Sequence, residues 1–221
     1  MKDTYKHKGQ RKRLINVLRE KGIHDERVLS ALEKIPRHLF FDPIFQEHAY
    51  EDKAFPIDAG QTISQPYTVA FQSQLLDVQK EDKILEIGTG SGYQASVLCE
   101  MAADVYSIEF QKTLYRKAIR FIPTLGLQPH LYLGDGSKGL PKFAPYDKIL
   151  VTAGAPSIPN ALLQQLKVGG RLVIPVGSGP SQQMTLLIRT DQNSVKKSVF
   201  DSFSFVPLLG ENGHSKSLTK H

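Results

Sequence analysis

The feature that most constrains the fold is an apolar run over residues 83–88 that leads into a glycine-rich turn. Glycines stand at positions 88, 90 and 92, directly after Ile84-Leu85-Glu86-Ile87. Glycine tolerates positive φ and has no Cβ, so bare main-chain amides can face a ligand where a helix begins after a strand. The pattern predicts a parallel strand, a tight turn and a helix, the repeating unit of a doubly wound sheet. A tight turn that binds nothing is the alternative.

The spacing of the glycines indicates which ligand the turn would bind. A dinucleotide site has the spacing G-x-G-x-x-G, which would require glycine at position 93, where this chain has Tyr93. The chain instead has E-x-G-x-G-x-G, which resembles the S-adenosylmethionine loop of the doubly wound methyltransferases. That resemblance implies that the cofactor-binding loop consists of Glu86, Gly88, Thr89, Gly90, Ser91 and Gly92.

Two later strands end at acidic residues. The run Ala103–Ile108 leads into Glu109, about twenty residues after the first glycine, where a ribose-binding acid belongs. A carboxylate there can accept hydrogen bonds from both ribose hydroxyls. The run His130–Leu133 leads into Gly134-Asp135-Gly136, which resembles the methyltransferase segment where an acid meets the adenine amino group. We therefore expect Asp135 and Gly136 at the cofactor, with a plain Asp-Gly turn as the alternative.

The order of the expected elements predicts the architecture. A helical N-terminal third, a strand–helix alternation and a strand-rich end predict an α/β fold: a doubly wound, mostly parallel Rossmann-like sheet with N-terminal helices and a C-terminal antiparallel strand pair. Strands are expected over 83–88, 103–109, 130–135, 148–152 and 171–176, helices near 93–101, 111–124 and 160–166, and the final pair over 183–190 and 194–203.

Chain length favours a single domain over residues 1–221. We expect a helical extension over 1–78 that contributes the substrate site, a nucleotide-binding core over 79–210 and a mobile tail over 211–221. No apolar stretch approaches the roughly 18 residues that span a bilayer, and the first residues lack the apolar core of a signal peptide. A cytoplasmic enzyme with no membrane partner is the simplest interpretation, and we expect a monomer.

Charge and cysteine content narrow the function further. The formal net charge is +6, and the first thirteen residues are rich in lysine and arginine, which raises the possibility of nucleic-acid binding. Apolar residues follow at helical spacing from Leu14 to Leu18, so the basic residues fit the solvated start of an amphipathic helix, and we expect no nucleic-acid partner. The single cysteine, Cys99, cannot form an internal disulfide, and no metal site is predicted from it and the scattered histidines.

A segment ahead of the glycine turn indicates the second substrate. Residues 54–67 read Ala-Phe-Pro-Ile-Asp-Ala-Gly-Gln-Thr-Ile-Ser-Gln-Pro-Tyr. This is similar to the G-Q-T-I-S-x-P signature of the protein-L-isoaspartate (D-aspartate) O-methyltransferases, and the likeness extends in order over about residues 10 to 210. Mild departures, such as Glu86 where many members carry Asp, leave the implied reaction unchanged.

The resemblance implies a reaction and a set of residue roles. The reaction is methyl transfer from S-adenosylmethionine to the free α-carboxylate of L-isoaspartyl residues in peptides and proteins, giving S-adenosylhomocysteine and a methyl ester that re-forms a succinimide and allows repair. Ser64 is expected to bind the acceptor carboxylate and Thr62 to steady its loop. Thr152 is expected at the cofactor, and Ala153, Gly154, Val206 and Leu208 around the peptide. A methyltransferase acting on a small molecule or on RNA is the alternative.

Overall fold

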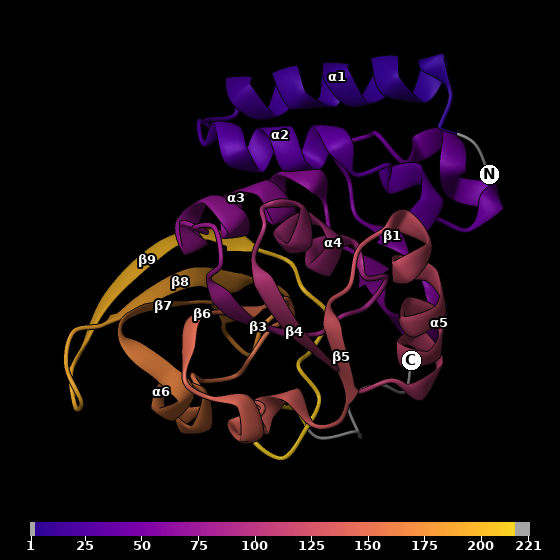
Figure 1. Cartoon of the computed structure of the whole chain (residues 1–221). Helices are drawn as coiled ribbons and strands as arrows, with labels where there is room; N and C mark the ends of the chain where they lie inside the picture. The colour runs from indigo at the N-terminus through magenta and orange to yellow at the C-terminus, as the bar shows by residue number, and fades with distance from the viewer. Residues whose placement is uncertain (1–2, 215–221) are drawn as a thin grey trace.

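A seven-stranded sheet forms the centre of the molecule in the computed structural model, which describes residues 3–214. Its strand order is β5-β4-β3-β6-β7-β8-β9 (Figure 1). The strands are β3 (Lys83–Ile87), β4 (Asp104–Glu109), β5 (His130–Leu133), β6 (Tyr146–Val151), β7 (Leu166–Val176), β8 (Gln182–Arg189) and β9 (Val195–Phe203). Strands β3 to β7 pair in parallel, whereas β8 pairs antiparallel with both β7 and β9. The predicted fold class is confirmed.

Helices cover the sheet and add a separate layer at the N-terminus. Helices α3 (Pro66–Leu76), α4 (Tyr93–Glu100), α5 (Lys112–Phe121) and α6 (Asn160–Gln165) pack against the strands, while α1 (Tyr5–Glu20) and α2 (Glu26–Lys34) lie above α3 and α4. Asp25 caps α2 as an N-cap residue should, accepting a hydrogen bond from the Arg27 amide at 2.9 Å. No helix within residues 3–214 is long and apolar enough to cross a membrane.

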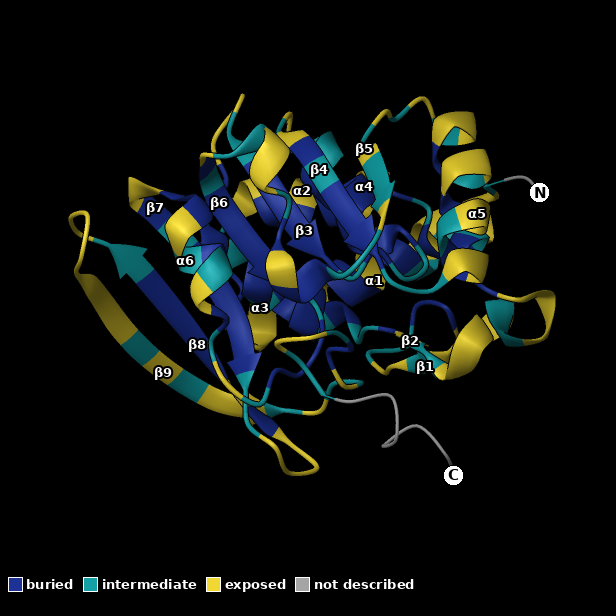
Figure 2. Ribbon diagram, turned by 90° about the horizontal axis from the view of Figure 1, so that it is seen from below, coloured by how far each residue is buried: buried dark blue, intermediate teal, exposed yellow. Residues whose placement is uncertain are grey.

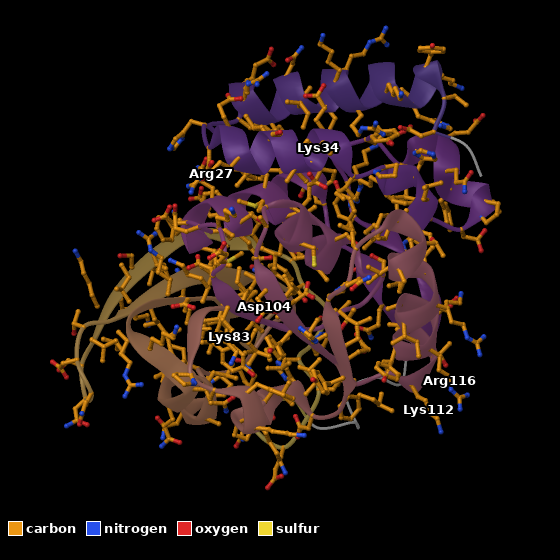
Figure 3. All side chains as sticks on the ribbon, in the orientation of Figure 1. Arg27, Lys34, Lys83, Asp104, Lys112 and Arg116 are labelled. Atoms are coloured by element: carbon orange, nitrogen blue, oxygen red, sulfur yellow. The ribbon has the colours of Figure 1, made fainter. Side chains whose placement is uncertain are left out.

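Burial follows the layers of the fold. Strands β3, β4 and β6 are buried over most of their length, whereas β9 at the edge is largely exposed (Figure 2). The N-terminal helices share one apolar cluster with Tyr93 and Val97 of α4, so they are packed onto the sheet domain through its first crossover helix. The charged side chains Lys112 and Arg116 of α5 point away from the body of the molecule (Figure 3).

Several segments differ from the predicted boundaries. β7 begins at Leu166, five residues before the predicted start. Its pairing with β6 continues through this part of the strand, with Gly169 at φ +80° and a shift of register between Tyr146 and Lys148 of β6. The short hairpin β1 (Phe55–Pro56) and β2 (Thr62–Ile63) and the 3-10 helices η1 (Arg37–Phe40) and η2 (Pro43–His48) carry no periodic signal long enough to predict.

The first residues of the predicted mobile tail pack against the sheet domain. The Glu211 amide donates to Asp135 Oδ2 at 2.8 Å, and the His214 amide donates to the Leu208 carbonyl at 2.7 Å. The remainder of that prediction, over 215–221, lies outside the described residues.

Candidate active site

The glycine turn between β3 and α4 adopts a conformation that other residues rarely reach. Gly88, Gly90 and Gly92 have φ of +98°, +54° and +86°. Space also restricts two of these positions: a Cβ on Gly88 would lie 2.6 Å from Thr152 Oγ1, and one on Gly92 would lie 2.6 Å from Ile122 Cδ1. The turn is therefore pressed against β6 on one side and against the end of α5 on the other.

Side chains from the strands on either side of β3 hold the turn in place. From the end of β6, the Thr152 hydroxyl lies 2.9 Å from the Ile87 carbonyl oxygen and 2.7 Å from that of Gly88. From the end of β4, Glu109 accepts hydrogen bonds from the amides of Gly90 and Gln111, both at 2.7 Å. Because β3 and β6 are neighbours where the strand order reverses, the turn lies at the topological switch point, where α/β proteins bind ligands.

Glu109 remains a hydrogen-bond acceptor despite these contacts. Burial raises the pKa of its carboxyl group, while the amides of Gln111 and Gly90 act in the opposite direction. An ionised carboxylate has about four lone-pair sites, so the amides of Gly90, Phe110 and Gln111 still leave acceptor capacity for a ligand's hydroxyl group. Its position beside the turn suits a diol on that ligand.

On the opposite side of the cavity, the segment with Ser64 is fixed from below by a buried arginine. Arg37 donates to the Ser64 carbonyl at 2.8 Å and to the Ala49 carbonyl at 3.0 Å, and its guanidinium lies 4.7 Å from the Tyr93 ring centroid. Complete burial lowers the pKa of Arg37 to about 10, so it stays charged at neutral pH. Gln65, with no side-chain cap, is the N-cap of α3, so the Ser64 hydroxyl is not a helix cap.

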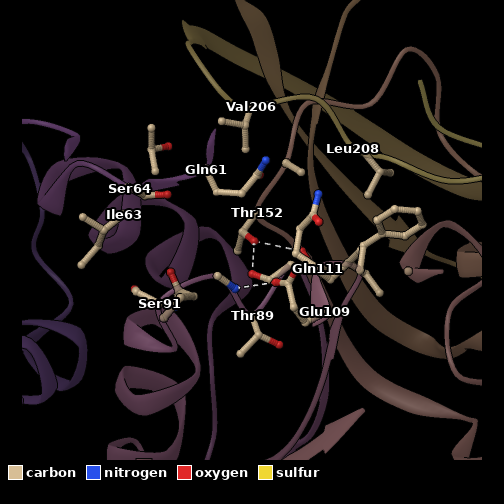
Figure 4. A pocket seen from close by; sticks show the side chains of 18 of the residues that line it. Gln61, Ile63, Ser64, Thr89, Ser91, Glu109, Gln111, Thr152, Val206 and Leu208 are labelled. Atoms are coloured by element: carbon tan, nitrogen blue, oxygen red, sulfur yellow. Dashed lines mark hydrogen bonds between the residues drawn. The ribbon is translucent and has the colours of Figure 1, made fainter. Parts of the chain in front are cut away.

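The two sides enclose one cavity, shown in Figure 4 with Ser64 and Ile63 facing Glu109 and Gln111 across Thr152. Most of the site residues predicted from the sequence line it. These are Thr62, Ser64, Gly88, Thr89, Gly90, Ser91, Glu109, Gly136, Thr152, Ala153, Val206 and Leu208. Segments distant in the sequence therefore meet where the resemblance implied a cofactor and a peptide.

Glu86 is predicted at the cofactor but does not line the cavity. It is fully buried beneath the turn, where Oε2 accepts a hydrogen bond from the Ser107 hydroxyl and Oε1 has no partner among the described residues. Ser107 Oγ lies 2.6 Å from Thr89 Oγ1, which does line the cavity. Burial raises the pKa of Glu86 to about 8, so this carboxyl group is mostly protonated at neutral pH and acts on the site only through Ser107 and Thr89.

Three other predicted residues also lie outside the cavity lining. Gly92 packs against Ile122. Asp135 accepts hydrogen bonds from the Ser137 amide at 2.9 Å and hydroxyl at 2.7 Å, besides the Glu211 amide. The Gly154 main chain pairs with the carbonyl of Val206 and the amide of Leu208, both at 2.8 Å. These hydrogen bonds pair the Leu208 amide within the protein and occupy one acceptor site of the Val206 carbonyl.

The cavity also includes residues that the sequence did not identify, among them Gln61, Tyr93, Gln94, Phe110 and Gln111. Phe110 and Gln111 directly follow Glu109, so their place at the strand end was available from the sequence. Gln94 and Arg37 gave no such signal. The Gln94 amide donates to the Ser73 hydroxyl of α3 at 3.0 Å, a contact that depends on how two helices pack.

Comparison with known proteins agrees with this geometry. A model of the family "Protein-L-isoaspartate(D-aspartate) O-methyltransferase" matches residues 9–213. A protein-L-isoaspartate O-methyltransferase of Christiangramia forsetii is 60% identical over 210 residues, covering 95% of this chain and 98% of the relative. Another of Cytophaga hutchinsonii is 53% identical over 220 residues, covering 100% of both chains.

Solved structures share the fold at lower sequence identity. A structure of a protein-L-isoaspartate O-methyltransferase superposes with a TM-score of 0.80 at 29% identity over 91% of this chain and 66% of that longer chain. A putative protein-L-isoaspartate O-methyltransferase of Plasmodium falciparum, solved in complex with S-adenosyl-L-homocysteine, shares the fold with a TM-score of 0.77 at 23% identity, covering 92% of this chain and 98% of that one. With a family match over nearly its whole length, this chain belongs to the protein-L-isoaspartate (D-aspartate) O-methyltransferase family.

Proposed function

We infer that this enzyme methylates the free α-carboxylate of L-isoaspartyl residues in damaged proteins, with S-adenosylmethionine as methyl donor, and we propose a role for each side of the cavity. The observation that carries the proposal is that residues 61–64 of the Gly60–Pro66 signature segment and the glycine turn line one cavity. A methyltransferase for RNA or a small molecule would need the turn but has no need of that segment.

The residues around the turn fit S-adenosylmethionine. Gly88 and Gly90 line the cavity with main chain that carries no side chain, while their amides donate to the Ile108 carbonyl and to Glu109. Glu109 retains acceptor capacity for the ribose hydroxyls. Thr89, Ser91, Gly136 and Thr152 complete this side. Glu86 and Gly92 support the turn from beneath. Contact between Asp135 and the adenine amino group stays a prediction; its carboxylate already accepts three hydrogen bonds out of about four possible.

The side with Ser64 fits the acceptor peptide. We propose that the Ser64 hydroxyl donates a hydrogen bond to the isoaspartyl carboxylate and that Thr62 holds the same segment. Ala153 leaves room for a peptide main chain, and the side chains of Val206 and Leu208 form the opposite wall. Gly154 supports that wall through its two main-chain hydrogen bonds.

Orientation, not proton transfer, is the task left to these residues. S-adenosylmethionine, when bound, supplies a methyl group on a strongly electrophilic sulfonium. The acceptor carboxyl group has a reference pKa near ~3.5 and is already ionised at neutral pH, so no general base is needed. The described residues that line the cavity include no histidine or lysine. Correct alignment of reacting groups contributes up to roughly 7–11 kcal/mol.

The enzyme's product begins a repair cycle that needs no further residue of this chain. A methyl ester has a good leaving group, methanol, whereas an ionised carboxylate does not. The neighbouring backbone nitrogen therefore attacks the ester carbonyl and re-forms a succinimide with release of methanol. Hydrolysis of that ring returns part of the material to normal aspartate. We further propose that the enzyme acts as a monomer in the cytoplasm, without a nucleic-acid partner; size-exclusion chromatography with light scattering tests the first point and cell fractionation the second.

The decisive experiment compares two peptides that differ only in aspartate against isoaspartate. With radiolabelled S-adenosylmethionine, we expect methyl incorporation into the isoaspartyl peptide with kcat/KM larger by orders of magnitude, because the aspartyl carboxylate sits on a differently routed chain and loses alignment. Comparable methylation of both peptides would contradict the proposal, even if the cofactor bound tightly.

A further inference from the structure

Two histidines and an aspartate come together at the start of α1, outside the lining of the active-site cavity. Asp3, His7 and His38 each offer one ligand atom, and these atoms all lie within 4.8 Å of one another. His7 stands in the first turn of α1 and His38 in η1, and their rings stack with centroids 3.8 Å apart. Packing of the N-terminal layer thus produces a cluster of metal-ligating groups that the sequence spacing conceals.

One nitrogen in the cluster is buried without a partner. His38 is 1% exposed; its Nδ1 lies 2.7 Å from the Tyr50 hydroxyl, while its Nε2 has no hydrogen-bond partner among the described residues. An unpaired buried polar atom costs free energy, and an unseen ion is one of its ordinary explanations. His7 Nδ1 accepts the Thr4 amide at 3.3 Å, which places the proton of the neutral ring on Nε2. A metal ion can bind at Nε2 of His7 only if this proton moves to Nδ1 and the hydrogen bond from Thr4 is given up.

The surroundings of His38 keep its ring in the state that binds metals. Burial and the neighbouring His7 lower the pKa of His38 to about 4, so its ring is neutral at pH 7, as a ligand must be. When Nδ1–H donates to the Tyr50 hydroxyl, Nε2 carries the lone pair and is the ligand atom. Metal-bound histidines likewise donate their other ring N–H to a neighbouring acceptor.

Arg11 is the feature that a cation must tolerate. Its guanidinium donates to the two Asp3 carboxylate oxygens at 2.9 and 3.2 Å and to the Tyr50 hydroxyl at 2.9 Å. Two such hydrogen bonds leave acceptor sites on a carboxylate, so Asp3 can still bind a metal ion. The positive charge of Arg11 lowers the affinity of the cluster for a metal ion. Its two hydrogen bonds to Asp3 also orient the Asp3 carboxylate.

We propose that Asp3, His7 and His38 bind a single divalent transition-metal ion, with zinc as the best fit and water completing the coordination. Two imidazoles and a carboxylate are a common zinc donor set. Zinc–ligand bonds of about 2.0–2.1 Å place two tetrahedral ligand atoms about 3.3 Å apart. The ligand atoms of the cluster lie within 4.8 Å of one another, so the most widely separated pair must move closer when the ion binds. Asp3 can supply this movement, because it precedes α1 and its side chain is 27% exposed.

Such an ion would be structural and would act next to the substrate side of the enzyme. It would join the start of the described chain to η1, where Arg37 holds the Ser64 carbonyl. We therefore expect zinc to raise the thermal stability of the protein and to leave the pH dependence and the substrate preference of methyl transfer unchanged.

The test compares the wild-type chain with His7→Gln and with the matched control His24→Gln, all stripped with a chelator and dialysed. Thr4 and His7 form a capping box at the start of α1, and glutamine at that position preserves the box. His7→Gln therefore removes one ligand without removing the helix cap. His24 is exposed and lies outside the cluster.

We expect wild type and His24→Gln to bind one equivalent of Zn²⁺ by calorimetry, with a melting temperature that rises by about 5–10 °C at a hundredfold excess over Kd. His7→Gln should lose at least tenfold in affinity while melting like the wild type without metal. Co²⁺ should give the visible absorption of a low-coordinate nitrogen and oxygen site in wild type and His24→Gln but not in His7→Gln. Equal zinc binding by His7→Gln and wild type, or no saturable one-to-one binding by wild type, would overturn the proposal.

Discussion

Replacing Gly88 with alanine tests whether the glycine turn is held by the close approach of Thr152. Alanine at φ +98° costs about 1–2 kcal/mol in backbone strain. Its Cβ would also lie 2.6 Å from Thr152 Oγ1, so the hydroxyl must leave the Ile87 and Gly88 carbonyls. Because that hydroxyl has a single hydrogen, one hydrogen bond is lost, which adds about 1 kcal/mol to the loss of stability. We expect a total loss of about 2–3 kcal/mol in unfolding free energy.

The chain offers a matched control for the strain contribution. Gly126 has φ +78° and nothing within 4 Å of the position its Cβ would take, so Gly126→Ala should lose only the strain, about 1–2 kcal/mol. Thr152→Ala should lose about 1 kcal/mol through its hydrogen bond. The double variant Gly88→Ala/Thr152→Ala then loses that hydrogen bond only once, so its cost should fall about 1 kcal/mol short of the sum.

Urea unfolding of the four variants and wild type measures these differences, and calorimetry with S-adenosylhomocysteine should show weaker binding to Gly88→Ala than to Gly126→Ala. If Gly88→Ala cost no more stability than Gly126→Ala, or if the cycle with Thr152→Ala were additive, contact with Thr152 would not be the reason for glycine at position 88. A normal slope of unfolding against urea would exclude a change in cooperativity as the cause.

Three further predictions concern single side chains. Glu109→Ala should weaken S-adenosylhomocysteine binding by about 1.5–3 kcal/mol, the free energy that hydrogen bonds to a charged group contribute. An unchanged Kd by calorimetry would show that Glu109 does not contact the ligand. Ser64→Ala should lower kcat with little change in melting temperature, because Gln65 and not Ser64 is the N-cap of α3; normal turnover would contradict contact with the acceptor. The pKa of Glu86 is raised to about 8 in the folded protein, so its protonation stabilises the fold fully below pH ~4, and this contribution is lost as pH rises through 8. Denaturation of Glu86→Gln at several pH values should show a smaller loss of stability between pH 5 and 8 than wild type, and parallel curves would refute a buried neutral carboxyl group.

The sequence predicted the parts of the site that lie at strand ends. Glu109 was identifiable because a strand ended there at a set distance from the glycines, and the position of an acid at a strand end follows from local pattern alone. Arg37 was not identifiable, because its value lies in reaching the Ser64 carbonyl from a 3-10 helix that has no periodic signal. The same reason hides the meeting of His7 with His38. Contacts between distant segments depend on tertiary packing, which local propensity does not encode.

Asp135 illustrates a second kind of limit. Its place after β5 was predicted, but no sequence pattern indicated that the amide of residue 211 would donate a hydrogen bond to its carboxylate. A local sequence pattern predicts where a residue lies in the fold, but it does not predict the hydrogen-bond partners of its side chain. Glu86 is a similar case. The motif places it at the turn, but in the folded protein it is buried beneath Thr89 and does not line the cavity.

The order of the sheet explains why the turn can be both exposed to a ligand and rigid. Glu109 and Thr152 hold the same turn from β4 and β6, the two neighbours of β3. Each is fixed by its own strand, so a ligand meets a main-chain turn whose position is set before the ligand binds. A reaction that needs alignment but no proton transfer gains most from such rigidity. Substitutions that loosen either contact should therefore lower kcat/KM even though neither side chain exchanges a proton with the substrate.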